Sequence, residues 1–237
     1  MRLPALDFRT NSRNPNPRVA CALLLDTSGS MGELPANGGP RPIDELNAGF
    51  IAFCSQIKND DLAKKRAEIA VITFGDEAQV AIEFTEGRNL QPRRFKAGGA
   101  TPLGHALELG IEELTRQKRA YRRAGLLYYR PWLFVVTDGE ATDVPEPFES
   151  AAERLRELEA AKSVNVFAIG VGRGVNFAQL SKLSALRKPL RLRGLNFAEF
   201  FLWLSASMSA ASTSDGVSLD SDDQLSLPPA SWGEIAL

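Results

Sequence analysis

Short runs of apolar residues recur along the chain, and each one ends at polar residues or glycine. The runs within 19–25, 131–139 and 164–172 show no alternation of apolar and polar positions. Such continuous runs are typical of strands that are covered on both faces of a parallel sheet. Two further runs, at 67–74 and 78–84, are separated only by the residues GDE. This short connection predicts an antiparallel hairpin.

Segments with a helical spacing of apolar residues separate these strands. Residues 43–57 follow Pro42, which the first turn of a helix tolerates, and 103–114, 146–162 and 197–208 show the same spacing. Strands that alternate with helices imply right-handed crossovers between parallel strands. We therefore predict an α/β fold of the doubly wound, Rossmann-like type. Its central sheet is mostly parallel, with one antiparallel edge strand and helices on both faces.

The chain divides into three parts by composition. Residues 1–17 are rich in proline, asparagine and arginine and form a lead-in segment, whereas residues 18–208 contain the predicted sheet and its helices. Residues 209–237 form a tail rich in serine and aspartate that turns apolar around Trp232. Either the tail is a disordered acidic end, or Trp232 docks on another surface.

The overall composition is that of an ordinary globular protein, since 44% of the 237 residues are hydrophobic and 24% are charged. The formal net charge of -1, from 28 basic and 29 acidic residues, argues against general nucleic-acid binding, which requires a basic surface. Two basic clusters, at 117–123 and 186–193, are predicted to be solvated helix and loop surface.

Cysteine usage and the absence of long apolar stretches bear on localisation. Cys21 and Cys54 lie within apolar segments, so we expect small core residues in a reducing compartment, not a disulfide or a metal pair. The N-terminal segment lacks the apolar core of a signal peptide. No apolar stretch reaches the roughly 18 residues of a membrane-spanning helix. We expect a soluble cytoplasmic protein without a membrane or nucleic-acid partner.

Side chains that carry oxygen gather where the predicted strands end. Asp26, Ser28 and Ser30 alternate after the first strand, so an extended backbone would place them on one face. Thr101 opens a predicted helix after a glycine-rich loop, and Asp138 follows another buried strand. In doubly wound sheets, ligands bind beyond the carboxyl ends of the strands, where the strand order reverses. Each feature alone is explained by a turn or a helix cap, but together they predict a site.

Ligands that are all oxygens suit a hard divalent ion. Mg²⁺ is the expected ion, with Mn²⁺ or Ca²⁺ as alternatives. Zinc prefers sulfur or imidazole ligands, and the chain contains only 1 histidine.

The motifs DTSGS at 26–30, GGATP at 98–102 and TDG at 137–139 resemble the complete metal-ion-dependent adhesion site (MIDAS) of the von Willebrand factor A (VWA) family. The resemblance implies direct metal binding by Ser28, Ser30 and Thr101, and direct or water-mediated binding by Asp26 and Asp138. It also implies an open coordination position for an Asp or Glu carboxylate of a protein partner. Residues that could form the rim of this site are Gly29, Gly99, His105, Gly139, Glu140 and Asp143. For His105, Glu140 and Asp143, an ordinary surface or loop position is the alternative.

A second, narrower resemblance concerns the segments ELNAGFIAF, ITFGDEAQV, TPLGHAL and FFLWLSASMSAAS. They resemble the bacterial TerY-like subgroup, which is named for tellurium-resistance gene clusters. The resemblance implies an adaptor in a stress-response or phospho-signalling system, with a kinase and a PP2C-type phosphatase as partners. A chaperone-like subunit of a metal-handling or ATPase complex is the alternative among binding proteins.

Enzymatic alternatives fit the sequence less well. A Mg²⁺-dependent phosphohydrolase or phosphotransferase could use Asp26 as its nucleophile, but Ser28 occupies the position where such enzymes need a second Asp. The sequence GVGRG at 170–174 lacks the full glycine spacing of a dinucleotide loop. No Gly-x-Ser-x-Gly elbow of a serine hydrolase is present. We therefore expect a protein without enzymatic activity.

Overall fold

The computed structural model describes residues 14, 16–35, 38–172, 174–213 and 233–235. Within them, a seven-stranded sheet has the order β3-β2-β1-β4-β5-β6-β7. The chain begins the sheet at β1, adds β2 on one side and later adds β4 on the other, so the strand order reverses between β1 and β4. The strands are β1 Val19–Asp26, β2 Ala67–Phe74, β3 Ala78–Glu86, β4 Trp132–Thr137, β5 Asn165–Val171, β6 Leu190–Leu192 and β7 Gly233–Ile235.

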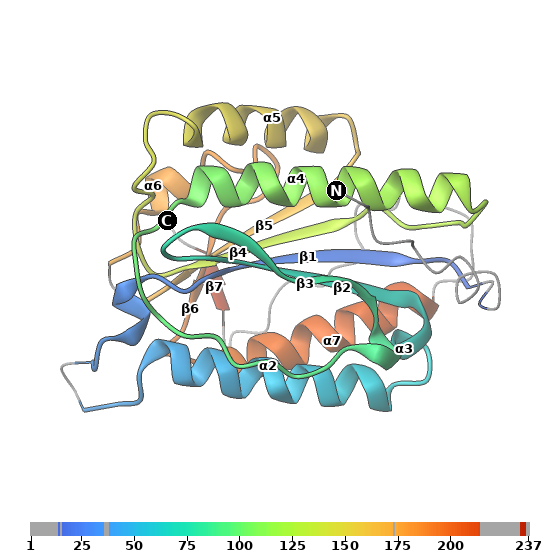
Figure 1. The fold of residues 1–237 in the computed structure, drawn as a ribbon, viewed down its shortest axis with the longest axis horizontal. Helices are drawn as coiled ribbons and strands as arrows, with labels where there is room; N and C mark the ends of the chain where they lie inside the picture. The colour runs from blue at the N-terminus through green and yellow to red at the C-terminus, as the bar shows by residue number, and fades with distance from the viewer. Residues whose placement is uncertain (1–13, 15, 36–37, 173, 214–232, 236–237) are drawn as a thin grey trace, which may run out of the picture.

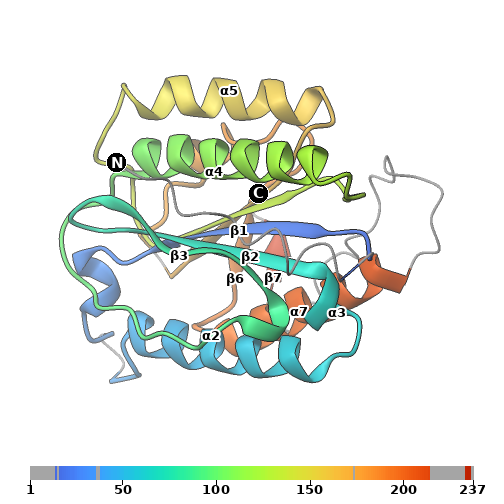
Figure 2. The ribbon, with the colours of Figure 1, turned by 45° about the vertical axis from the view of Figure 1, so that its right-hand side comes forward.

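Helices cover both faces of this sheet (Figures 1 and 2). One face carries α2 Pro42–Asn59, α3 Ala63–Arg66 and α7 Phe197–Thr213. The other face carries α4 Leu103–Arg123, α5 Phe148–Ala160 and α6 Phe177–Leu180. Across the described part of the chain, no helix has both the length and the apolar character that a bilayer crossing requires.

β1 is fully buried and contributes side chains to two separate hydrophobic cores. Its odd-numbered residues from Val19 to Leu25 belong to the core beneath α2 and α7. Its even-numbered residues from Ala20 to Leu24 belong to the core beneath α4 and α5. Because successive side chains of a strand point to opposite faces, a strand between two helical layers needs apolar residues at every position. This explains the unbroken run VACALLL.

The predicted fold class is confirmed. β1 is parallel to both β2 and β4, and β3 pairs antiparallel with β2 as the short connection predicted. The structure adds a second antiparallel pair at the opposite edge, where β7 pairs with β6. Trp232, the candidate anchor of the tail, lies outside the described residues, but its neighbour Gly233 pairs with Leu192 in that ladder.

The prediction that both basic clusters are solvated surface is wrong in part. In the cluster at 117–123, Gln117 and Tyr121 are buried and donate hydrogen bonds to the Glu68 carboxylate, from Tyr121 Oη at 2.8 Å. In the cluster at 186–193, the leucines of β6 are buried. Uncharged residues interspersed among the cations therefore point into the protein interior.

A buried ion pair anchors the chain at the start of β1. Arg18 is fully buried, and its Nε lies 2.9 Å from Glu68 Oε1. Its other nitrogens donate to the carbonyls of Asn16 (3.0 Å) and Asn14 (3.1 Å). These contacts fix the described end of the lead-in segment against the sheet, whereas residues 1–13 and 15 lie outside the described part.

Candidate metal centre

The chain turns sharply where β1 ends, and this turn carries two of the predicted ligands. Ser28 is still extended, with φ -61° and ψ 172°, but Gly29–Gly32 form a 3-10 helix, η1. η1 is the blue turn on the left of Figure 1. The expected alternation of Asp26, Ser28 and Ser30 along an extended strand is therefore wrong for Ser30. The curl of the backbone after Ser28, not a strand pleat, brings Ser30 to the site.

Asp26 is fully buried, and both of its carboxylate oxygens accept hydrogen bonds. Oδ1 accepts from the Ser28 N–H at 2.8 Å, and Oδ2 accepts from the Thr137 hydroxyl at the end of β4. Burial raises the pKa of Asp26, while the bonds from Ser28 and Thr137 act in the opposite direction. Asp26 thus ties the end of β1 to the end of β4 and fixes the start of the loop that follows.

Ser28, Ser30 and Asp138 form a continuous row of hydrogen-bonded oxygens. Ser30 Oγ donates to Asp138 Oδ1 at 2.8 Å, and Ser28 Oγ lies 3.0 Å from Ser30 Oγ. Burial, and after it the charge of Asp26, raises the pKa of Asp138 to about 6. Two carboxylates in a partly buried site repel each other, and a divalent cation between them would remove that repulsion.

Thr101 comes from a loop that is bonded to the turn after β1. The Gly29 N–H donates to Gly99 O at 3.1 Å, and Gly99 has φ +79°, a conformation that favours glycine. Thr101 itself is buried, and a Cβ placed on Gly139 would lie 3.7 Å from its Oγ1. The Thr101 hydroxyl therefore sits beside the loop that follows β4. Three of the predicted rim residues, Gly29, Gly99 and Gly139, are thus part of the loops that form the site.

The other predicted rim residues have structural partners. Asp143 Oδ1 accepts from the Gly104 N–H (3.1 Å), and Oδ2 accepts from the His105 N–H (3.0 Å) and lies 3.0 Å from His105 Nδ1. Asp143 therefore caps the start of α4, where a carboxylate satisfies free N–H groups and the helix dipole. His105 is 59% exposed on the helix surface. Glu140 accepts a hydrogen bond from Asn176 Nδ2 at 2.5 Å.

Two threonines that sequence reasoning missed position the predicted ligands. Thr137 holds Asp26, and Thr142 brackets Thr101 by accepting from its N–H (3.2 Å) and donating to its carbonyl (2.9 Å). Thr137 immediately precedes Asp138 at a strand end, so its place in the motif was a usable signal. Thr142 lies 41 positions from Thr101 in the sequence, and no local pattern links the two residues.

The five predicted ligands thus come from three segments: the end of β1 with the turn after it, the loop before α4, and the loop after β4. The strand order reverses between β1 and β4, so the site lies at the reversal point of the sheet. In the described part of the chain, no group of three or more His, Cys, Asp and Glu residues is arranged to hold a metal. The donor set is instead two carboxylates and three hydroxyls, a combination that suits a hard cation.

Comparison with known proteins agrees with this geometry. Residues 21–191 match the von Willebrand factor type A domain, and the chain belongs to this family. An uncharacterized protein of Mycobacterium tuberculosis is 31% identical over 145 residues, which are 60% of this chain and 20% of that protein. The chain spans only 20% and 24% of the length of two curated bacterial relatives that it matches.

Solved structures with the same fold include proteins that hold divalent metals. Proximal thread matrix protein 1 from the mussel byssus, with a zinc-occupied MIDAS motif, has a TM-score of 0.51 and 15% identity, covering 82% of this chain and 48% of that one. The manganese-loaded TRAP protein of Plasmodium vivax has a TM-score of 0.51 and 20% identity, covering 79% of this chain and 72% of that one. At these identities the likeness is one of fold.

Proposed function

We propose that this chain is a divalent-metal-dependent protein-interaction module with a complete MIDAS. Ser28, Ser30 and Thr101 bind the ion directly, and Asp26 and Asp138 bind it directly or through water. The observation that supports this most strongly is the row of oxygens from Ser28 through Ser30 to Asp138, which two hydrogen bonds of 3.0 and 2.8 Å already hold together. Because the row exists in the fold itself, an ion would find its ligands prepositioned.

The ligand chemistry supports docking of a carboxylate. Three neutral hydroxyls cancel little of the ion's charge, and Mg²⁺ takes six oxygen ligands, so a position remains for a partner. An Asp or Glu side chain of another protein supplies a hard, charged oxygen at that position. The partner is therefore recognised through the ion, and the surrounding loops select among acidic partners.

Mg²⁺ is the proposed ion, with Mn²⁺ and Ca²⁺ as alternatives. The preference of zinc for sulfur and imidazole ligands argues against Zn²⁺. The mussel protein nevertheless holds zinc in its MIDAS motif, so Zn²⁺ is added to the ions to be compared. The metals to compare in solution are therefore Mg²⁺, Mn²⁺, Ca²⁺ and Zn²⁺.

The burial of Asp26 favours the interaction module over a phosphohydrolase. A carboxylate nucleophile must reach a substrate phosphorus in line, yet Asp26 has no exposed surface and both of its oxygens accept hydrogen bonds. Its geometry suits a residue that positions a loop and balances the charge of a nearby ion. Asp26 is therefore assigned a structural and electrostatic role, and the chain no enzymatic activity.

We place the chain in a bacterial stress-response or phospho-signalling system of the tellurium-resistance type, in the cytoplasm. A kinase and a PP2C-type phosphatase are the proposed partners. This placement is supported by the resemblance of four sequence segments to the TerY-like subgroup. The two described cysteines are also free and buried, as expected in a reducing compartment.

Metal titration tests the site. Isothermal titration calorimetry with Mn²⁺ should show one ion bound by the wild type and binding weakened at least tenfold in Ser30→Ala, because a direct ligand and the bridge to Asp138 are lost. Ser55→Ala, which removes an exposed serine hydroxyl on α2, is the matched control and should bind as the wild type does. Equal affinity in all three proteins would disprove the assignment.

Partner capture tests the function. Pull-downs from bacterial extracts with Mg²⁺ or with EDTA should recover partners only with Mg²⁺, and Ser30→Ala should recover none. Capture that survives both EDTA and the substitution would contradict docking through the metal. Turnover of para-nitrophenyl phosphate that is abolished in Asp26→Ala would support the phosphohydrolase instead.

A further inference from the structure

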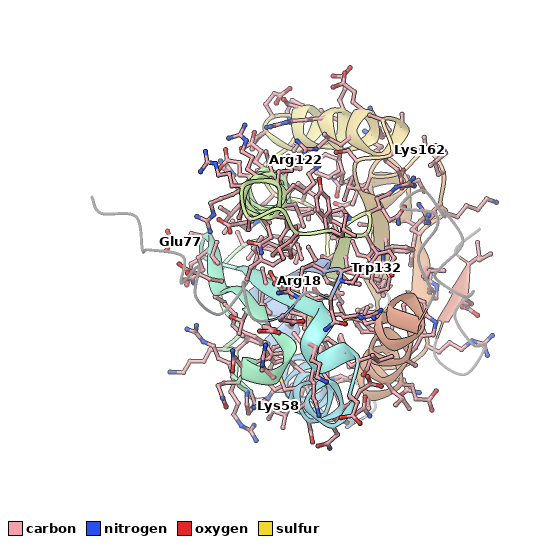
Figure 3. The ribbon with its side chains drawn as sticks, turned by 90° about the vertical axis from the view of Figure 1, so that its right-hand side faces the viewer. Arg18, Lys58, Glu77, Arg122, Trp132 and Lys162 are labelled. Carbon is pink, nitrogen blue, oxygen red and sulfur yellow. The ribbon has the colours of Figure 1, made fainter. Side chains whose placement is uncertain are left out.

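A pocket of about 350 Å³ lies at the end of the sheet opposite the candidate metal centre. Its walls are the last turns of α4, residues 126–131 before β4, and residues 161–163 between α5 and β5. Figure 3 views this end of the molecule, with Arg122 and Lys162 beside the ends of α4 and α5. The volume falls within the range of small-ligand sites, about 300–1,000 Å³.

The pocket is lined by several cations and, among the described residues, by no carboxylate. The four cationic residues are Lys118, Arg122, Arg130 and Lys162. Neither acid in the last turn of α5 lines the pocket: Glu159 forms an ion pair with Arg187 at 2.9 Å, and Glu157 is exposed outside the lining. The carboxyl ends of α4 and α5 add roughly half a negative charge each, which leaves a clear positive excess.

Two hydroxyl groups of the pocket accept hydrogen bonds from its cations. Tyr128 Oη accepts from Arg122 Nε at 3.1 Å, and Lys118 Nζ donates both to Ser163 Oγ and to Ser163 O, the latter at 3.2 Å. A hydroxyl that accepts a bond keeps its own hydrogen for another acceptor. Burial, and after it the charge of Arg122, lowers the pKa of Lys118, as expected for an ammonium group that has no negative neighbour among the described residues.

Lys162 occupies a backbone conformation that favours glycine or asparagine. Its φ is +54°, and it is the only described non-glycine residue with positive φ. Its N–H donates to Glu159 O (2.9 Å) and the Ser163 N–H donates to Leu158 O (2.8 Å), which together form a Schellman motif at the end of α5. A lysine here costs about 1–2 kcal/mol of backbone strain. Strained residues of this kind cluster at active sites and ligand clamps.

We propose that this pocket binds the phosphate group of a small phosphate ester, through Arg122, Lys118 and Lys162. A phosphate offers several acceptor oxygens and about two negative charges, which match a pocket rich in donors and cations. Leu126, Leu127 and Pro131 give the pocket an apolar wall beside these cations, suited to the organic part of the ester. The ester is either a nucleotide or a phosphorylated amino-acid side chain, since both carry the same group.

This phosphate site is independent of the metal-dependent docking function. It lies at the carboxyl ends of α4 and α5, whereas the candidate metal centre lies at the opposite end of the sheet. It requires no divalent ion, so its binding should persist in EDTA and in Ser30→Ala. A failure of either hypothesis therefore leaves the other intact.

Amide NMR titrations in EDTA at constant ionic strength test the proposal. The probes are inorganic phosphate, adenosine monophosphate and phosphoserine with blocked termini. We expect shifts of the backbone amides at 126–130 and 161–163, with binding about tenfold weaker in Arg122→Gln. Arg123→Gln removes the same charge one position away, outside the pocket lining, and should stay within about twofold of the wild type. The better of the two esters identifies the source of the phosphate.

A second variant separates a binding role from a structural one. Lys162→Asn removes the charge but suits positive φ better, so it should weaken phosphate binding while the thermal midpoint stays equal or rises. The proposal is overturned if millimolar concentrations of all three probes leave these amides unshifted. It is equally overturned if Arg123→Gln weakens binding as much as Arg122→Gln, or if Lys162→Asn binds as tightly as the wild type.

Discussion

Replacing Gly99 with alanine perturbs the candidate metal centre through the backbone, without touching a ligand. Gly99 has φ +79°, which costs a residue with a side chain about 1–2 kcal/mol. A Cβ at this position would also lie 2.5 Å from Asp76 Cα, closer than a Cβ can approach another carbon. The loop must therefore shift, and with it the Gly29 N–H to Gly99 O bond that joins it to the turn after β1.

Two other glycines separate the conformational cost of Gly99→Ala from its steric cost. Gly194 has φ +61° with open space around its Cβ position, so Gly194→Ala carries only the conformational cost, less the entropy that alanine removes from the unfolded chain. Its expected loss is about 1 kcal/mol. Gly98 lies in the same loop as Gly99, with open space and without positive φ, so Gly98→Ala should stabilise by about 0.5 kcal/mol. Gly99→Ala adds about 1–3 kcal/mol of steric overlap, for a total of about 2–4 kcal/mol.

Urea unfolding of the three variants measures these free energies, and Mn²⁺ titration of each measures the effect on the site. Gly99→Ala should bind the ion more weakly than the wild type, because the shifted loop carries Thr101 away from Ser28 and Ser30. Gly98→Ala and Gly194→Ala should bind as the wild type does. A stability of Gly99→Ala equal to that of Gly194→Ala would refute the steric argument. Unchanged Mn²⁺ affinity in Gly99→Ala would refute the coupling between loop and site.

Three further outcomes are expected. Glu68→Ala leaves the buried Arg18 charge without its partner and should lower the free energy of unfolding in urea by about 3–5 kcal/mol; a loss under about 1 kcal/mol would contradict a buried charge pair. Asp143→Ala should cost about 1 kcal/mol in the same assay by removing the cap of α4, and Asp143→Asn less. Burial raises the pKa of Cys54 to about 11, so at pH 8 only about one thiol in a thousand is ionised. Cys54 and the buried Cys21 should therefore react with Ellman's reagent only on unfolding, and rapid reaction of the native protein would count against their burial.

The candidate site was largely predictable because several of its ligands follow strands that can be recognised from a short run of apolar residues. VACALLL and WLFVV are apolar at every position, so they had to be buried strands, and Asp26 and Asp138 had to lie near their carboxyl ends. The details of the site were not predictable. Ser30 reaches the row of oxygens through a 3-10 turn, and Asp143, expected at the rim, caps a helix instead.

The sequence by itself determined the order of the first five strands and the four long helices, the two-faced burial of β1 and the types of oxygen ligand, because these depend on neighbours a few positions apart. Only the tertiary structure decided which distant residues meet. The pairing of β7 with β6 joins segments about 40 residues apart, and the cation pocket joins α4 to the end of α5. Such contacts depend on crossovers and on the packing of whole layers, and no local periodicity encodes them.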